Sequence, residues 1–120
     1  MKTKRLPKGL FALTPGLTRQ REDLQELLLR IGKGLEAGLP ALLLREPLLP
    51  DDSFLFLAKR TMELAARFGD AWIGVHDRLH VAQAVEADGV HLGFRSLAPS
   101  VAHEVLGEGY AIGFSAHEGD

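Results

Sequence analysis

Short apolar runs alternate along the chain with longer stretches in which apolar residues recur every three or four positions. The short continuous runs are typical of buried strands, and the three-to-four spacing places apolar side chains on one face of a helix. The runs predict strands over residues 10–13, 41–44, 71–75, 88–92 and 110–114. The spaced positions predict helices over residues 19–36, 54–68 (capped by Asp51, Asp52 and Ser53 and closed by Gly69), 78–86 and 99–106.

This order of elements predicts an α/β fold of alternating parallel β/α units in a single domain, residues 1–120. Continuous apolar strands, as opposed to alternating ones, indicate a parallel sheet whose two faces are both covered. Two architectures fit, an open doubly wound sheet and the first five strands of a (βα)8 barrel. The dinucleotide-binding form of the first is disfavoured, because Thr14-Pro15-Gly16 follows the first strand in place of a glycine-rich phosphate loop.

The composition narrows the class of protein. The net charge of −2, from 14 Lys+Arg and 16 Asp+Glu, gives no basis for a nucleic-acid or membrane partner. The absence of cysteine excludes disulfides, thiolate metal sites and a cysteine nucleophile. No apolar run approaches the roughly 18 residues of a membrane span, and no signal core follows the basic N-terminus, so we expect a cytoplasmic protein. The absence of both asparagine and cysteine hints at a thermophilic source.

Polar residues capable of binding or catalysis gather just past the carboxyl ends of the predicted strands. In parallel α/β folds these ends meet at one edge of the sheet, where binding and catalysis take place. We therefore expect one functional edge, formed by Thr14, Arg45, Glu46, His76, Asp77, His91, Ser115 and His117.

Purely structural roles compete with this interpretation at several positions. Asp77 stands at the start of a predicted helix and could be its N-cap. Arg45 and Glu46 could form a surface ion pair that contributes little to stability. His91 closes an apolar strand and could be a hydrogen-bonded core residue, and Asp88 could serve a turn or cap.

Four segments together resemble the thiamine phosphate synthase/TenI superfamily, in matching order and spacing. The most specific is the block from Ala87 to Gly93, which reads A-D-G-V-H-L-G, and the next is I-G-F-S-A-H over residues 112–117. The other two are Leu44-Arg45-Glu46 and His76-Asp77-Arg78. The resemblance implies a (βα)8 barrel that acts on the thiazole phosphate half of thiamine.

The chain departs from the synthase pattern at positions that the resemblance marks as functional. Synthases carry Q-x-R-x-K, N-D-R and Q-x-D, where this chain has Leu43, Arg45 and Pro47, then His76-Asp77-Arg78, then Phe94-Arg95-Ser96. Of the two Mg²⁺ carboxylates that the resemblance implies, Asp77 is kept and the other is replaced by Ser96. Because Mg²⁺ prefers several hard oxygen ligands, Asp77 alone makes a poor metal site.

These departures favour the TenI-like branch, a thiazole tautomerase that moves a proton on carboxythiazole phosphate without a cofactor. The resemblance then implies His117, with Ser115, as the acid–base group and Arg45 as the carboxylate clamp. The substrate is expected to contact His76, Asp77, His91 and Thr14. One alternative is a thiamine-phosphate synthase that requires Mg²⁺, and another is a non-catalytic module that binds a thiazole or a partner protein.

The length bears on how the site is completed. A whole (βα)8 barrel usually needs about 200 residues or more, and its phosphate site lies after the last two strands. The chain supplies five predicted strands within its 120 residues. We therefore expect the barrel to be completed by a homo-oligomer or by a complementing fragment.

Overall fold

The computed structural model describes residues 12–92 and 111–114, and the side chains of residues 12–91. Its strands are β1 (Ala12–Leu13), β2 (Ala41–Leu44), β3 (Trp72–His76), β4 (Gly89–Leu92) and β5 (Ala111–Phe114). Its helices are α1 (Leu24–Glu36), α2 (Asp51–Arg67) and α3 (Leu79–Val85), with the 3₁₀ turn η1 (Arg21–Asp23) before α1. The elements predicted in these ranges are confirmed, while the predicted helix 99–106 lies outside the described residues.

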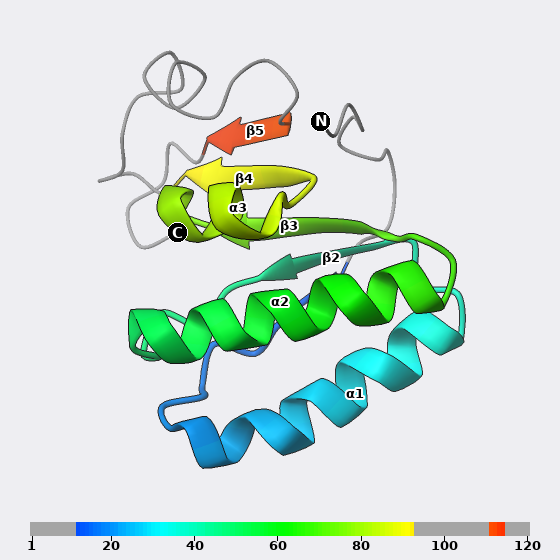
Figure 1. Cartoon of the computed structure of the whole chain (residues 1–120), viewed down its shortest axis with the longest axis horizontal. Helices are drawn as coiled ribbons and strands as arrows, with labels where there is room; N and C mark the ends of the chain where they lie inside the picture. The colour runs from blue at the N-terminus through cyan, green and yellow to red at the C-terminus, as the bar shows by residue number, and fades with distance from the viewer. Residues whose placement is uncertain (1–11, 93–110, 115–120) are drawn as a thin grey trace.

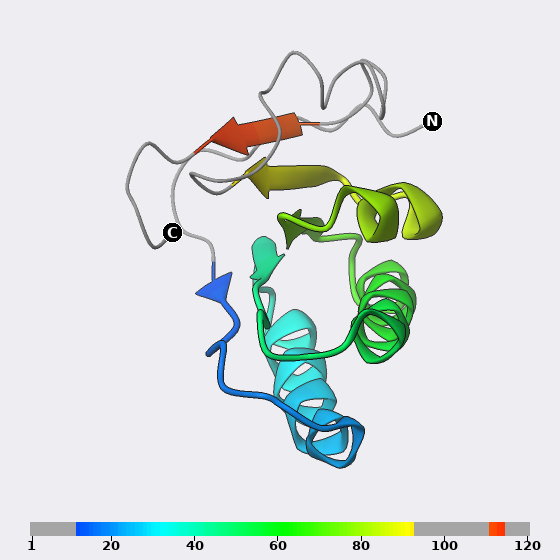
Figure 2. The same ribbon diagram turned by 90° about the vertical axis from the view of Figure 1, so that its left-hand side faces the viewer.

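The strands form one parallel sheet in the order β1-β2-β3-β4-β5 (Figure 1). In a doubly wound sheet the strand order reverses after the first units and helices cover both faces. Here the order is sequential, and α1, α2 and α3 all lie on the outer side of a curved sheet (Figure 2). The structure therefore has the arrangement of consecutive (βα)8-barrel units, and the doubly wound alternative is wrong.

The two faces of the sheet carry different side chains, because neighbouring residues of a strand point to opposite faces. One set packs against the helices and belongs to the main core: Leu42, Leu44, Ile73, Val75 and Val90. The other set, with Trp72, Gly74 and His76 in β3, faces the concave side. A Cβ atom on Gly74 would lie 2.5 Å from two atoms of the Trp72 ring, so glycine at this position makes room for the indole.

The helices supply the rest of this core from their inner stripes. They contribute Leu24, Leu27, Ile31 and Leu35 from α1, and Phe54, Leu57, Ala58 and Ala65 from α2. The three-to-four spacing that predicted the helices is therefore the spacing of their buried residues. None of the helices in the described part of the chain is both long and apolar enough to span a membrane.

The helix starts differ from the predictions. Residues 21–23 form the turn η1, so α1 begins at Leu24 and not at residue 19. Pro50 occupies the N-cap position of α2, and the carboxylates expected to cap it lie inside its first turn, where the helix dipole favours negative charge. Asp52 Oδ1 there accepts the Ser53 N–H at 2.8 Å.

Two aspartates expected in caps have other roles. Arg78 occupies the N-cap position of α3, so the cap alternative for Asp77 is wrong. Asp88 is fully buried, and its Oδ2 accepts the Ile73 N–H at 2.8 Å. The Asp88 N–H donates to the Ile73 carbonyl at 2.8 Å. Asp88 thus fixes the start of β4 against β3 instead of capping a turn.

We expect the substitution Leu57→Ala to lower the free energy of unfolding by about 2–5 kcal/mol, because it leaves a cavity between α2 and the sheet. Leu57 is 0% exposed, whereas Leu29 on the outer side of α1 is 62% exposed. Leu29→Ala is the matched control and should change the value by about 0.5 kcal/mol or less. Urea unfolding followed by Trp72 fluorescence measures both, and equal effects would contradict this core.

Candidate functional site

The carboxyl ends of the strands bring the predicted residues to one edge of the sheet. Thr14 follows β1, Arg45 follows β2, Asp77 follows β3, and the parallel register pairs His76 with His91 at the ends of β3 and β4. The sequence thus correctly places all five on this edge. Ser115 and His117, predicted as the acid–base pair, lie outside the described residues.

Thr14 joins the first two of these strand ends. Its hydroxyl accepts the Arg45 N–H at 2.8 Å and donates to the Arg45 carbonyl at 3.1 Å. Its own N–H donates to the Leu43 carbonyl at 3.1 Å. Thr14 is buried, so its visible role is to hold the Arg45 backbone, and a contact with substrate stays a prediction.

The side chain of Glu46 joins the first loop (residues 14–20, between β1 and η1) to the second loop (residues 45–50, between β2 and α2). The carboxylate accepts the N–H groups of Gly16 at 2.7 Å and of Thr18 at 2.9 Å. Glu46 is 1% exposed, so the surface ion-pair alternative for Arg45 and Glu46 is wrong. The sequence carried no signal for this role, since the loop that Glu46 binds is about 30 residues earlier in the chain.

Arg45 extends its half-buried side chain alongside the first loop. A Cβ atom on Gly16 would lie 3.8 Å from Arg45 Nη1 and 3.5 Å from the Arg45 carbonyl oxygen. Gly16 has φ +80°, a left-handed conformation that favours glycine. The guanidinium therefore lies beside a loop segment whose N–H is already held by Glu46.

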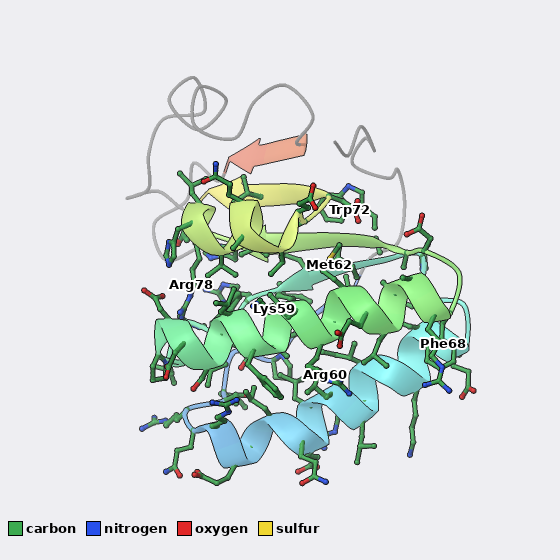
Figure 3. The ribbon with its side chains drawn as sticks, in the orientation of Figure 1. Lys59, Arg60, Met62, Phe68, Trp72 and Arg78 are labelled. Carbon is green, nitrogen blue, oxygen red and sulfur yellow. The ribbon has the colours of Figure 1, made fainter. Side chains whose placement is uncertain are left out.

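Arg78 binds the second loop from the end of β3, a role that the sequence did not reveal. Its guanidinium donates to the carbonyls of Glu46 at 3.0 Å and Leu49 at 2.6 Å. It also pairs with Asp51 Oδ1 at 2.8 Å and lies 4.3 Å from the ring centroid of Phe54. Arg78 accordingly lies at the N-terminal end of α2 (Figure 3), where it fixes the β2–α2 connection.

His76, Asp77 and His91 form a compact group beside these loops. The imidazole rings stack with centroids 5.3 Å apart and planes at 25°. Asp77 Oδ2 lies 3.3 Å from His76 Nδ1, and the Asp77 N–H donates to the His91 carbonyl at 2.8 Å. Within the described part of the chain the buried Nδ1 of His91 has no hydrogen-bond partner.

Asp77 adopts φ +67°, an unusual conformation for a residue other than glycine. Most L-residues avoid the left-handed conformation, and aspartate is among those that tolerate it best. In this conformation the carboxylate reaches back to His76, which precedes it in the chain. Asp70 and Glu86 have the same conformation where α2 and α3 end, so at Asp77 it marks a sharp change of chain direction after β3.

The residues of this edge do not by themselves fit a magnesium site. Mg²⁺ takes oxygen ligands in near-octahedral geometry, and Asp77 offers one carboxylate, which already contacts an imidazole. Among residues 12–92 and 111–114, no group of three or more His, Cys, Asp or Glu side chains is arranged to hold a metal ion. The second position implied by the resemblance, Ser96, lies outside these ranges.

A curved parallel sheet with helices on its outer side defines a (βα)-barrel-type protein, and its polar groups gather at the carboxyl ends of the strands, where barrels of this type carry their sites. The profile of a family described as thiamine monophosphate synthase matches residues 16–120, and the chain belongs to this family. The resemblance seen in the sequence is thereby confirmed.

Individual relatives agree. A putative thiamine-phosphate synthase of Geobacter sulfurreducens is 41% identical over 107 residues, 89% of this chain and 50% of the relative. A thiamine-phosphate synthase of Moorella thermoacetica is 42% identical over 82 residues, 68% of this chain and 39% of the relative. The solved thiamine phosphate pyrophosphorylase of Pyrococcus furiosus superimposes with a TM-score of 0.72 at 29% identity, covering 87% of this chain and 48% of that one. The chain spans about half the length of the first and third of these proteins and about two fifths of the second.

We expect Thr14→Val to lower the free energy of unfolding by about 1–3 kcal/mol, because it leaves the N–H and carbonyl of Arg45 without the hydroxyl that bonds both. Thr14→Ser keeps the hydroxyl and serves as the control. Urea unfolding gives the stability, and amide hydrogen exchange at Arg45 should accelerate only in the valine variant. Equal exchange rates at Arg45 in the two variants would contradict the assigned bonds.

Proposed function

We propose that the protein acts in thiamine biosynthesis as a thiamine-phosphate synthase, which joins a pyrimidine pyrophosphate to a thiazole phosphate. The observation that carries the proposal is the 41% identity to a putative synthase over 89% of this chain. Other relatives of similar identity carry the same name. These relatives support the synthase over the tautomerase that the sequence alone favoured.

The geometry supports a role for Arg45 in binding the anionic substrates. A guanidinium forms paired, charge-assisted hydrogen bonds with phosphate and carboxylate groups. The Arg45 backbone is held by Thr14, and its side chain lies beside the Gly16 segment at the carboxyl edge of the sheet. We infer that Arg45 holds a phosphate group of one substrate there.

A thiazole tautomerase is the second candidate, and the histidine group is the observation that favours it. Two stacked imidazoles and a carboxylate lie together at one edge, and these are side chains that serve as general acids and bases in enzymes. In this reaction His117 would act as acid and base with Ser115 beside it, and His76, Asp77 and His91 would contact the carboxythiazole phosphate. No metal would be required.

The test is to supply the protein, as its gene encodes it, with both sets of substrates. With pyrimidine pyrophosphate, thiazole phosphate and Mg²⁺, we expect thiamine phosphate and pyrophosphate to form in equal amounts, as followed by ³¹P NMR. Arg45→Ala should lower kcat/KM by about 100-fold, as expected for the loss of a charged contact to substrate. Arg30→Ala is the control, because Arg30 lies exposed on α1 and pairs only with Glu26 among the described residues.

Isomerisation of carboxythiazole phosphate without metal is measured on the same preparation. If this conversion occurs, is abolished by His117→Ala and no thiamine phosphate forms, the tautomerase replaces the synthase. If neither reaction occurs in a folded sample, both assignments fail, and the remaining hypothesis is the non-catalytic binding module.

A further inference from the structure

We propose that Glu46 is a positioning residue of the site, whose buried carboxylate fixes the first loop as the surface against which the Arg45 guanidinium is held. The inference rests on the proposed role of Arg45 in binding substrate. It gives a role to a residue that the sequence placed on the functional edge without assigning it one. Four sets of contacts support it.

The first is the commitment of the Glu46 carboxylate. A fully buried carboxylate requires strong hydrogen-bond donors, since burial removes its hydration. Glu46 is 1% exposed, and its two oxygens accept separate donors, the N–H groups of Gly16 and Thr18. Such charge-assisted bonds are among the stronger hydrogen bonds in proteins, so they set where residues 16–18 lie.

The second is what those residues support. The Gly16 segment lies beside Arg45, with Arg45 Nη1 at 3.8 Å from the position that a Gly16 Cβ would take. Gly16 donates its N–H to Glu46 from a left-handed conformation, φ +80°, which few other residues adopt. Displacement of this segment would therefore give the Arg45 side chain more space to move.

The third is the anchoring of Glu46 itself. Its carbonyl accepts the Arg78 guanidinium at 3.0 Å and the Leu49 N–H at 3.2 Å. Arg78 belongs to the third loop (residues 77–78, between β3 and α3). Hydrogen bonds therefore connect the third loop to Glu46 in the second loop, and Glu46 to the first loop. Three consecutive loops of the edge are thereby held in one arrangement.

The fourth is the neighbouring backbone. The single hydroxyl of Thr14 bonds both the N–H and the carbonyl of Arg45. The Arg45-Glu46 dipeptide is thus fixed at the Arg45 N–H, both carbonyls and the Glu46 carboxylate. Fixing a long side chain before the substrate arrives reduces the entropy lost on binding, which is the usual benefit of preorganisation.

The test compares Glu46→Gln with Glu63→Gln. The glutamine variant at 46 keeps the size of the side chain, but it removes the charge and presents an NH₂ group to one of the two N–H donors. Glu63 pairs with Arg60 on the exposed side of α2, with its side chain 64% exposed, so its substitution controls for the loss of one negative charge.

The first measurement needs no ligand. In ¹⁵N relaxation spectra, the order parameter of the Arg45 Nε–H should fall in Glu46→Gln and stay unchanged in Glu63→Gln. The amide proton signals of Gly16 and Thr18 should move upfield only in the variant at 46, because their hydrogen bonds weaken. An unchanged Arg45 Nε–H in a folded Glu46→Gln protein would overturn the proposal.

The second measurement is a double-mutant cycle on the affinity for thiazole phosphate, by calorimetry. Glu46→Gln should weaken binding about 10-fold in the wild-type background and less than about 2-fold when Arg45 is already alanine, because residues that act through each other are not additive. Equal losses in both backgrounds would mean that Glu46 acts independently of Arg45, and the positioning role would be wrong.

Two further outcomes remain decisive. If Glu46→Gln does not fold, Glu46→Asp retains the charge with one methylene fewer and should show the same loss of order at Arg45; unchanged order would again overturn the proposal. If the wild-type protein does not bind thiazole phosphate, the proposed function fails, while the Arg45 Nε–H signal still decides the role of Glu46.

Discussion

The constraint on which the rest of the structure depends is the sequential parallel pairing of the strands. Because each strand pairs with the next in the same direction, every connection from a strand to the following helix emerges at one edge of the sheet. Residues about 30 positions apart, such as Thr14 and Arg45, then become neighbours. With α1, α2 and α3 on one side, the other face curves inward and carries Trp72 over Gly74.

The buried polar groups at this edge hold the loops in place, and the loops in turn position the other side chains of the edge. A carboxylate and a guanidinium are costly to bury without partners. Glu46 and Arg78 meet that requirement mainly with backbone N–H and carbonyl groups, not with each other's charges. Their partners are loop atoms that no helix or strand satisfies. The same bonds that offset desolvation therefore give the connections a fixed shape.

The pattern of apolar residues was sufficient to predict the strands and the approximate helices, since burial on the sheet and on the helix stripes is a local periodic signal. It could not choose between a barrel and a doubly wound sheet, because that choice depends on strand order. The apolar pattern also could not show that Asp77 does not cap α3, since this depends on the left-handed backbone at that residue. Arg78 and Glu46 could not be assigned because their partners are backbone atoms of distant loops. The predicted oligomer or complementing fragment stays a prediction.

His76 and Arg78 flank Asp77, and these two neighbours have different roles at this edge. The side chain of Arg78 turns toward α2 and stabilises the scaffold. His76, two residues earlier, has its ring against His91 and its Nδ1 near the Asp77 carboxylate. The left-handed φ of Asp77 changes the chain direction between them. Since residues two apart in a strand share a face, His76 continues the concave face of β3 formed by Trp72 and Gly74. The left-handed residue after it is what allows Arg78 to leave that face, so that one tripeptide supplies both a candidate substrate contact and the anchor of the neighbouring loop.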